Sequence, residues 1–120
     1  MAAAATAAKL LKLNVSKTRM TLGLAGSQAA GLIENFGTMT KGFHSGNAAR
    51  AGVLAALLVQ RGYVASQEII EGDHGLYHAI VGKDNYDLGK VTENLGKVWE
   101  IMTPGLAIKR YPCCGGNARA

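Results

Sequence analysis

The chain has 120 residues, of which 48% are apolar, so it is long enough for one domain with a modest core and is not disordered in composition. Its net charge of +5 comes from scattered lysines and arginines that form no basic run, which disfavours nucleic acid as a partner and leaves small acids open. The longest apolar run, residues 51–59, is too short to span a membrane.

The first third of the chain is predicted to form two helices. Residues 2–11 are rich in alanine, the strongest helix former, and lack the charge pattern of a targeting segment. A second helix is predicted over residues 17–32, with Ser16 as its N-cap. We interpret the GLAG sequence at 23–26 as a helix-packing contact, because no strand precedes it and the Lys-Ser/Thr pair of a phosphate-binding loop is absent.

A loop and a long apolar helix are predicted next. Glycine and asparagine interrupt the periodicity over residues 33–42, which is typical of a loop. Ser45 or Asn47 is expected to cap a helix that continues to Gln60 and stops before Gly62. The middle of this helix, AGVLAALLV, is apolar in every direction, which predicts a helix buried on all sides.

The last third of the chain is predicted to contain shorter elements. Short helices are expected over residues 66–72, 75–81 and 87–95. Two short strands are expected over 98–102 and 106–109, with a Thr-Pro-Gly turn between them. The predicted fold is therefore mainly α, with short β-strands at the C-terminal end.

Lys41 and His44 lie just before the predicted apolar helix. Backbone N–H groups at a helix N-terminus favour anions, and a neighbouring lysine adds positive charge. A histidine can act as an acid or a base near neutral pH. The pair is therefore a candidate site for anion binding and proton transfer. The alternative is an exposed loop lysine beside a capping or packing histidine.

His74 and His78 are four residues apart, which is a spacing that can bind zinc on a helix. Gly75 lies between them, neither cysteine is near them in sequence, and two ligands do not make a metal site. We interpret both histidines as solvated polar residues, so the sequence predicts no metal site.

Lys109 and Arg110 precede the sequence Tyr-Pro-Cys-Cys-Gly-Gly, which favours a shaped turn that binds an anion. A nucleophilic cysteine would need an activating partner, and the sequence shows no dedicated one, so Cys113 and Cys114 are interpreted as inert thiols. Adjacent cysteines do not easily reach ordinary disulfide geometry. A reducing compartment, the cytoplasm, is therefore the expected location.

Five segments along nearly the whole chain resemble the MmgE/PrpD family, which includes 2-methylcitrate dehydratase and cis-aconitate decarboxylase. In family order they are AAAATAAKLLKLN, LGLAGSQAAGL, FGTMTKGFHSGNAARAGVLAALLVQRGY, EIIEGDHGLY and IKRYPCCGG. The resemblance implies a large all-helical domain and a smaller α+β lid, with the active site between them. Residues 1–106 would be part of the helical domain, and residues 107–120 would begin the lid. Because relatives are several times longer, the chain resembles an internal fragment of a protein that is expected to form homodimers.

The same resemblance implies roles for individual residues. Lys41 and His44 match active-site positions of the family and are the expected catalytic residues. Lys109 matches a lysine at the junction of the two domains, and it is expected to bind substrate together with its neighbour Arg110. Relatives place these cations around a di- or tricarboxylate, and family dehydration uses no metal or other cofactor.

The chain departs from the family pattern at several positions. Gly42 stands where relatives usually have proline, and Asn117 and Ala118 replace a common Thr-His pair. Cys114 occupies a position where the decarboxylase branch has histidine, which favours dehydration over decarboxylation of cis-aconitate. The leading hypothesis is a fragment or truncated member of a 2-methylcitrate dehydratase-like lyase (a hydro-lyase), which is expected to be inactive alone. The alternative is a non-catalytic helical module that binds an acidic metabolite or a partner subunit.

Overall fold

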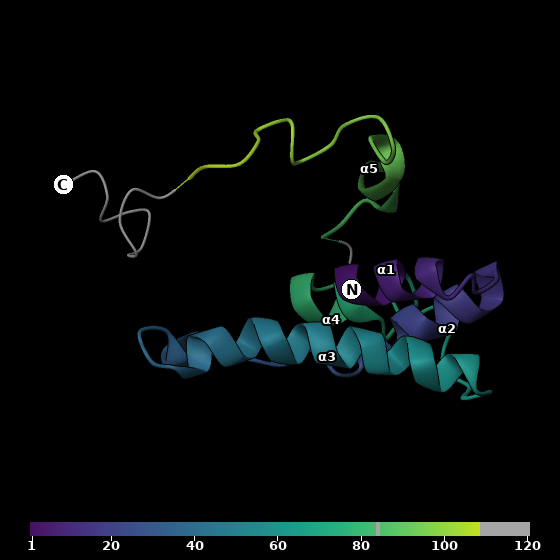
Figure 1. Cartoon of the computed structure of the whole chain (residues 1–120). Helices are drawn as coiled ribbons and strands as arrows, with labels where there is room; N and C mark the ends of the chain where they lie inside the picture. Colours follow the sequence, from purple (N-terminus) through teal and green to yellow (C-terminus); the bar gives the residue numbers. More distant parts are fainter. Residues whose placement is uncertain (84, 109–120) are drawn as a thin grey trace. The chain divides into compact units, whose positions relative to one another are not determined.

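The computed structural model describes residues 1–83 and 85–108, and its regular elements are helices (Figure 1). They are α1 (Ala2–Leu10), α2 (Val15–Gly26), the 3-10 helix η1 (Ile33–Asn35), α3 (Thr40–Gln60), α4 (Leu76–Val81) and α5 (Leu88–Glu93). The prediction of a mainly α fold is confirmed. None of the helices in the described ranges combines the length and the apolar character needed to cross a membrane. The chain divides into two compact units, Met1–Tyr86 and Asp87–Ala120.

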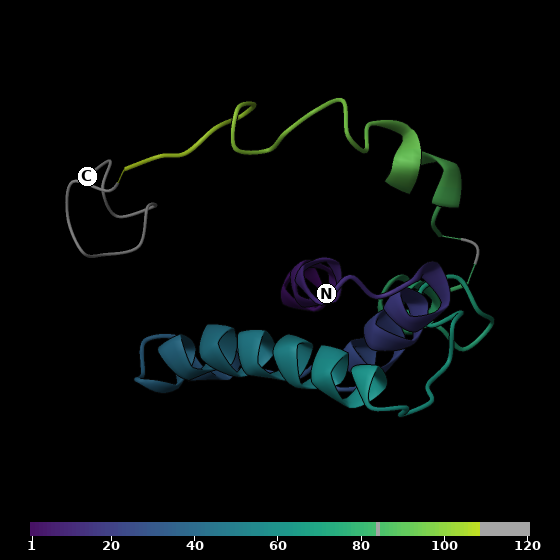
Figure 2. The ribbon, with the colours of Figure 1, turned by 45° about the vertical axis from the view of Figure 1, so that its right-hand side comes forward.

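In the first unit, α1 and α2 pack on each other and both pack on α3. Figures 1 and 2 show them on the same side of α3, with the N-terminal end of α3 extending past them. The centre of the contact consists of small side chains, because Ala4 of α1, Ala25 of α2 and Ala55 of α3 are all buried, and Leu22 and Leu24 pack against them. Small side chains at the contact let the helix backbones approach closely.

Two glycines mark the closest backbone approaches. A Cβ atom added to Gly52 would lie 2.6 Å from the backbone nitrogen of Ala4 and 2.9 Å from the Cβ of Ala3. A Cβ atom on Gly23 would overlap the carbonyl oxygen of Ser66. Gly23 is thus a close packing contact, but its neighbour is the segment after α3 rather than another helix as predicted.

α2 begins and ends earlier than predicted. Its N-cap is Asn14 rather than Ser16, because Asn14 Oδ1 accepts a hydrogen bond from the backbone N–H three residues later at 2.9 Å. The helix stops well before the predicted end at residue 32. Gln28 Nε2 donates to the carbonyl oxygen of Leu24 at 3.2 Å and so satisfies a carbonyl group of the last turn.

α3 is covered along one side only. The covered side carries small residues and one valine, namely Ala51, Gly52, Ala55, Ala56 and Val59. The other side carries Val53, Leu54 and Leu57, which are between 38% and 46% exposed. The predicted burial on all sides is therefore wrong for the described residues. An all-round apolar helix can be buried on every side, but its sequence does not show which neighbours cover it.

The C-terminal end of α3 agrees with the prediction that it continues to Gln60. The N–H of Tyr63 donates to the carbonyl oxygen of Leu58 at 3.0 Å, and the N–H of Gly62 donates to that of Val59 at 3.0 Å. These two bonds form a Schellman motif, which satisfies carbonyl groups at the end of the helix.

Residues 66–72 form turns, so the helix predicted there is wrong. The segment is held by a side chain of α2. Arg19 Nε donates to the carbonyl oxygen of Gln67 at 2.8 Å, and Arg19 Nη2 pairs with Glu71 Oε1 at 2.9 Å. These two contacts connect the segment to α2, and within the segment the N–H of Gly72 donates to the carbonyl oxygen of Glu68 at 2.8 Å.

In the second unit, the short helix predicted over 87–95 is confirmed as α5, but the predicted strands are not. The strand predicted over 98–102 is wrong, because the N–H groups of Met102 and Thr103 both donate to the carbonyl oxygen of Trp99, at 2.8 and 3.0 Å. These bonds close turns, and residues 100–104 are turns rather than an extended strand. The strand predicted over 106–109 has no counterpart in its described part.

Candidate functional site

Lys41 and His44 lie in the first two turns of α3, not in a loop ahead of it. The predicted helix start at Ser45 or Asn47 is therefore wrong. Because the lysine and the histidine are three residues apart in a helix, their side chains share a face and are separated by about 4.5 Å along the helix axis. The structure thus brings these two predicted site residues together.

The backbone N–H groups at the start of α3 already have acceptors. The N–H of Thr40 donates to Thr38 Oγ1, that of Lys41 to the carbonyl oxygen of Thr38, and that of Gly42 to the carbonyl oxygen of Met39, each at 3.2 Å. This turn explains why the helix starts early, since it satisfies donors that a helix N-terminus leaves free. Positive charge at this end of α3 therefore comes chiefly from the Lys41 side chain.

The segment between α2 and α3 contacts both side chains. His44 is half-buried, and a Cβ atom on Gly31 would lie 3.4 Å from its Cγ and Nδ1 atoms. The φ of Gly31 is +123°, a conformation that residues with side chains rarely adopt. Lys41 is exposed, with its Nζ 5.2 Å from the centroid of the Phe36 ring. Among the described residues no carboxylate pairs with Lys41.

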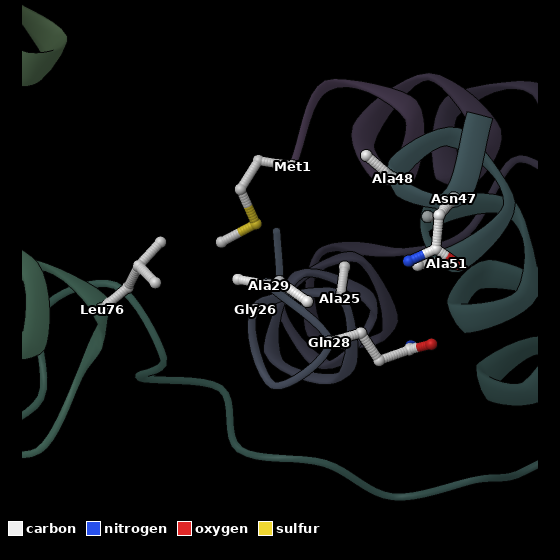
Figure 3. Close-up of a pocket in the computed structure, with 11 residues that line it drawn as sticks. Met1, Ala25, Gly26, Gln28, Ala29, Asn47, Ala48, Ala51 and Leu76 are labelled. Carbon is white, nitrogen blue, oxygen red and sulfur yellow. The ribbon is translucent and has the colours of Figure 1, made fainter. Parts of the chain in front are cut away.

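A cavity of about 220 Å³ lies beside α3, where Asn47, Ala48 and Ala51 line it (Figure 3). We call it the side cavity. Ala48, which lines it, lies four residues after His44 and therefore on the same face of the helix. The lining residues come from the N-cap of α1, the last turn of α2 and the segment after it, the middle of α3 and the start of α4. They are Met1, Ala25, Gly26, Gln28, Ala29, Ala30, Asn47, Ala48, Ala51, Gly52 and Leu76.

Two amide side chains are the polar side chains of the side cavity, and each is partly engaged within the chain. Asn47 Oδ1 accepts from Arg50 Nε at 3.3 Å and from Arg50 Nη2 at 3.0 Å. Gln28 Nε2 donates to the carbonyl oxygen of Leu24. Sequence reasoning considered Asn47 only as a helix cap. The three-residue spacing between Asn47 and Arg50 within a helix is the sequence signal for the hydrogen bonds between their side chains.

The other candidate residues do not join this site in the described part of the chain. The rings of His74 and His78 have centroids 6.2 Å apart. No third histidine, cysteine, aspartate or glutamate completes a metal-binding group with them among the described residues. Lys109, Arg110 and both cysteines lie outside the described residues.

The sequence of the chain matches one family model and several characterised proteins. The sequence pattern of the MmgE/PrpD N-terminal domain matches residues 1–89. The chain is 36% identical over 120 residues to cis-aconitate decarboxylase of Aspergillus terreus, covering 95% of this chain and 24% of that protein. It is 32% identical over 114 residues to human cis-aconitate decarboxylase, covering 93% of this chain and 23% of that protein.

The mouse cis-aconitate decarboxylase gives a similar match, 31% identical over 114 residues, which covers 93% of this chain and 22% of the mouse protein. The chain therefore spans about a quarter of the length of the curated relatives that it matches. The match to the domain pattern extends from α1 through the first residues of α5, and so includes the whole of α3 and the side cavity. By this match, the chain belongs to the MmgE/PrpD family.

Proposed function

We propose that the chain supplies one wall of the substrate site of a lyase that acts on small di- or tricarboxylates. The observation that carries the proposal is the placement of Lys41 and His44 one turn apart on one face of α3, in a chain of this family. The names of the relatives support a tricarboxylate as the substrate, because cis-aconitate is one.

The two side chains suit the chemistry of such an acid. The Lys41 ammonium group pairs with a substrate carboxylate through charge-assisted hydrogen bonds. His44 gives or takes a proton at the reacting carbon or at the leaving hydroxyl group. On sequence grounds we assign Lys109 and Arg110 to a second carboxylate of the same substrate.

Two reactions are compatible with these roles. In dehydration, which Cys114 favours, a proton leaves carbon and the departing hydroxyl group gains one, so that water is released. In decarboxylation, which the names of the relatives favour, carbon dioxide leaves and the carbon that held it gains a proton. Product analysis separates them, because only decarboxylation releases carbon dioxide and shortens the acid by one carbon.

The proposal is tested in a full-length relative that carries the same lysine and histidine. We expect the equivalent of His44→Ala to lower kcat by about 10²- to 10⁴-fold, the usual contribution of a positioned acid or base. Loss of the Lys41 ammonium group in Lys41→Ala is expected to lower kcat/KM by about 10- to 100-fold.

The matched control is Arg61→Ala, which removes a cation at the opposite end of the same helix. It is expected to leave turnover within about twofold of the unmodified enzyme. Unchanged turnover in the two site variants would contradict the proposed roles of Lys41 and His44.

A further inference from the structure

A β-turn joins η1 to the start of α3, and it presents Phe36 beside Lys41. The N–H of Thr38 donates to the carbonyl oxygen of Asn35 at 3.3 Å and closes the turn. Phe36 has φ −68° and ψ 140°, and Gly37 has φ +89°, which are typical of the two central residues of a type II turn. The path of the backbone through this turn therefore determines where the Phe36 ring lies.

Thr38 belongs both to this β-turn and to the first turn of α3. Its hydroxyl group donates to the carbonyl oxygen of Asn35 at 2.8 Å, which is the same oxygen that closes the β-turn. The hydroxyl oxygen also accepts from the N–H of Thr40 at 3.2 Å, and the carbonyl oxygen of Thr38 accepts from the N–H of Lys41 at 3.2 Å. Thr38 thus fixes the β-turn to the N-terminal end of the helix.

The contact between Lys41 and Phe36 depends on this connection. The Lys41 Nζ atom lies 5.2 Å from the centroid of the Phe36 ring, within the range of a cation–π contact. A lysine ammonium group ends a flexible four-carbon stem, and the ring face favours some of its positions over others. Because Lys41 lies on the helix and Phe36 on the β-turn, the two groups meet only while the turn and the helix keep their relative placement.

We infer that Thr38 is a positioning residue for Lys41. Its hydroxyl group holds the β-turn that carries Phe36 against the first turn of α3, and the Lys41 ammonium group is thereby placed before a carboxylate binds. Placing the group in advance reduces the freedom that is lost on binding, which strengthens binding. The inference rests on the proposed function, since it takes Lys41 as the group that binds a carboxylate of the substrate.

The first experiment measures the contact in the full 120-residue chain, labelled with ¹³C and ¹⁵N. The ring current of an aromatic side chain shifts protons above its face upfield, so the Hε resonances of Lys41 are expected upfield of those of the other lysines. Phe36→Leu defines their position without the ring. Thr38→Val removes the hydroxyl group with little change of shape and is expected to move these resonances to the same position, whereas Thr38→Ser is expected to leave them upfield.

The matched control is Thr40→Val, which makes the same chemical change two residues away. Thr40 contributes its backbone N–H to the contact with Thr38, and the substitution keeps that group. The Hε resonances of Lys41 are therefore expected to stay upfield in Thr40→Val. A general weakening of the helix start by valine would move them in both valine variants.

The second experiment measures kinetics in a full-length relative that carries the same threonine, phenylalanine and lysine. Loss of a helix-capping hydroxyl group and of an exposed cation–π contact predicts that Thr38→Val raises KM by about three- to tenfold. We expect kcat to stay within about twofold, because the lost contribution is to substrate binding, and Thr38→Ser to restore KM. In the Lys41→Ala background, Thr38→Val is expected to have no further effect on KM, since Thr38 acts through the lysine.

The outcomes separate the inference from the proposed function. Lys41 resonances that do not move in Thr38→Val, or that move equally in Thr38→Ser and Thr40→Val, would overturn the positioning role while the proposed function stands. A rise in KM that persists in the Lys41→Ala background would also overturn it, because a merely structural effect does not need the lysine. If Lys41→Ala leaves kcat/KM unchanged, the proposed role of Lys41 fails, and the resonance shifts still decide whether Thr38 positions its side chain.

Discussion

Gly46 and Gly52 lie in the same helix but in opposite surroundings. A Cβ atom on Gly46 would meet nothing within 4 Å, whereas one on Gly52 would lie 2.6 Å from the backbone nitrogen of Ala4. Gly52→Ala therefore pushes α1 away from α3, and we expect it to lower the free energy of unfolding by about 1–3 kcal/mol. Gly46→Ala adds helix propensity without a clash and is expected to raise it by about 0.5–1 kcal/mol.

Urea denaturation followed by circular dichroism measures both free energies of unfolding. The two variants make the same chemical change in the same helix, so helix propensity cancels in their comparison. Equal effects of the two substitutions would show that α1 does not contact α3 at Gly52.

At the scale of elements, the two sides of α3 differ in what covers them. Val59 is 1% exposed and Val53 is 46% exposed, although both lie in the same apolar run. Val59→Lys buries a charge without a partner, which costs about 3–5 kcal/mol and is expected to abolish the cooperative unfolding transition. Val53→Lys places its charge in solvent and is expected to change the free energy of unfolding by less than about 1 kcal/mol.

Thermal unfolding followed by circular dichroism distinguishes these two lysine variants. If Val53→Lys unfolds the chain as thoroughly as Val59→Lys does, the side of α3 that carries Val53 must be covered in solution. The comparison therefore also reports whether the chain associates through this side of α3.

The type of most helices could be predicted from the sequence, but several of their ends could not. Alanine content and apolar periodicity identify α1, α2 and the body of α3 because these signals are local. The start of α3 depends on bonds to Thr38 that satisfy the first N–H groups of the helix, so that Gly42 and Gly46 are helical despite their poor propensity. Residues 66–72 contact Arg19 of α2, which is distant in sequence, and a local pattern does not reveal such a contact.

The candidate site shows the same division between local and tertiary information. Lys41 and His44 could be found from the sequence, since a cation and a titratable side chain stand together in a segment that resembles the family. The contact of His44 with Gly31 and the side cavity could not be found, because they require α2, α3 and the segment between them to be folded against one another. Sequence spacing reveals the faces of a single helix but not the space between helices.

At the scale of the whole molecule, the site is expected to be catalytically silent in this chain alone. Lys41 and His44 lie toward the N-terminal end of α3, which extends past α1 and α2 (Figure 1), and the chain spans about a quarter of its relatives. Catalysis depends on several groups held together in a fixed geometry, and loss of part of such a set removes most of the rate.

We therefore expect the purified chain to bind carboxylates without turnover above the uncatalysed rate. The measurement is the ultraviolet absorbance of the unsaturated acid in a solution of 2-methylcitrate or cis-aconitate, together with carbon dioxide release. The control is a full-length relative under the same conditions, which shows that the assay detects the reaction. Turnover by the purified chain that is lost in His44→Ala would contradict this expectation, because it would mean that the groups needed for catalysis are all present in these 120 residues.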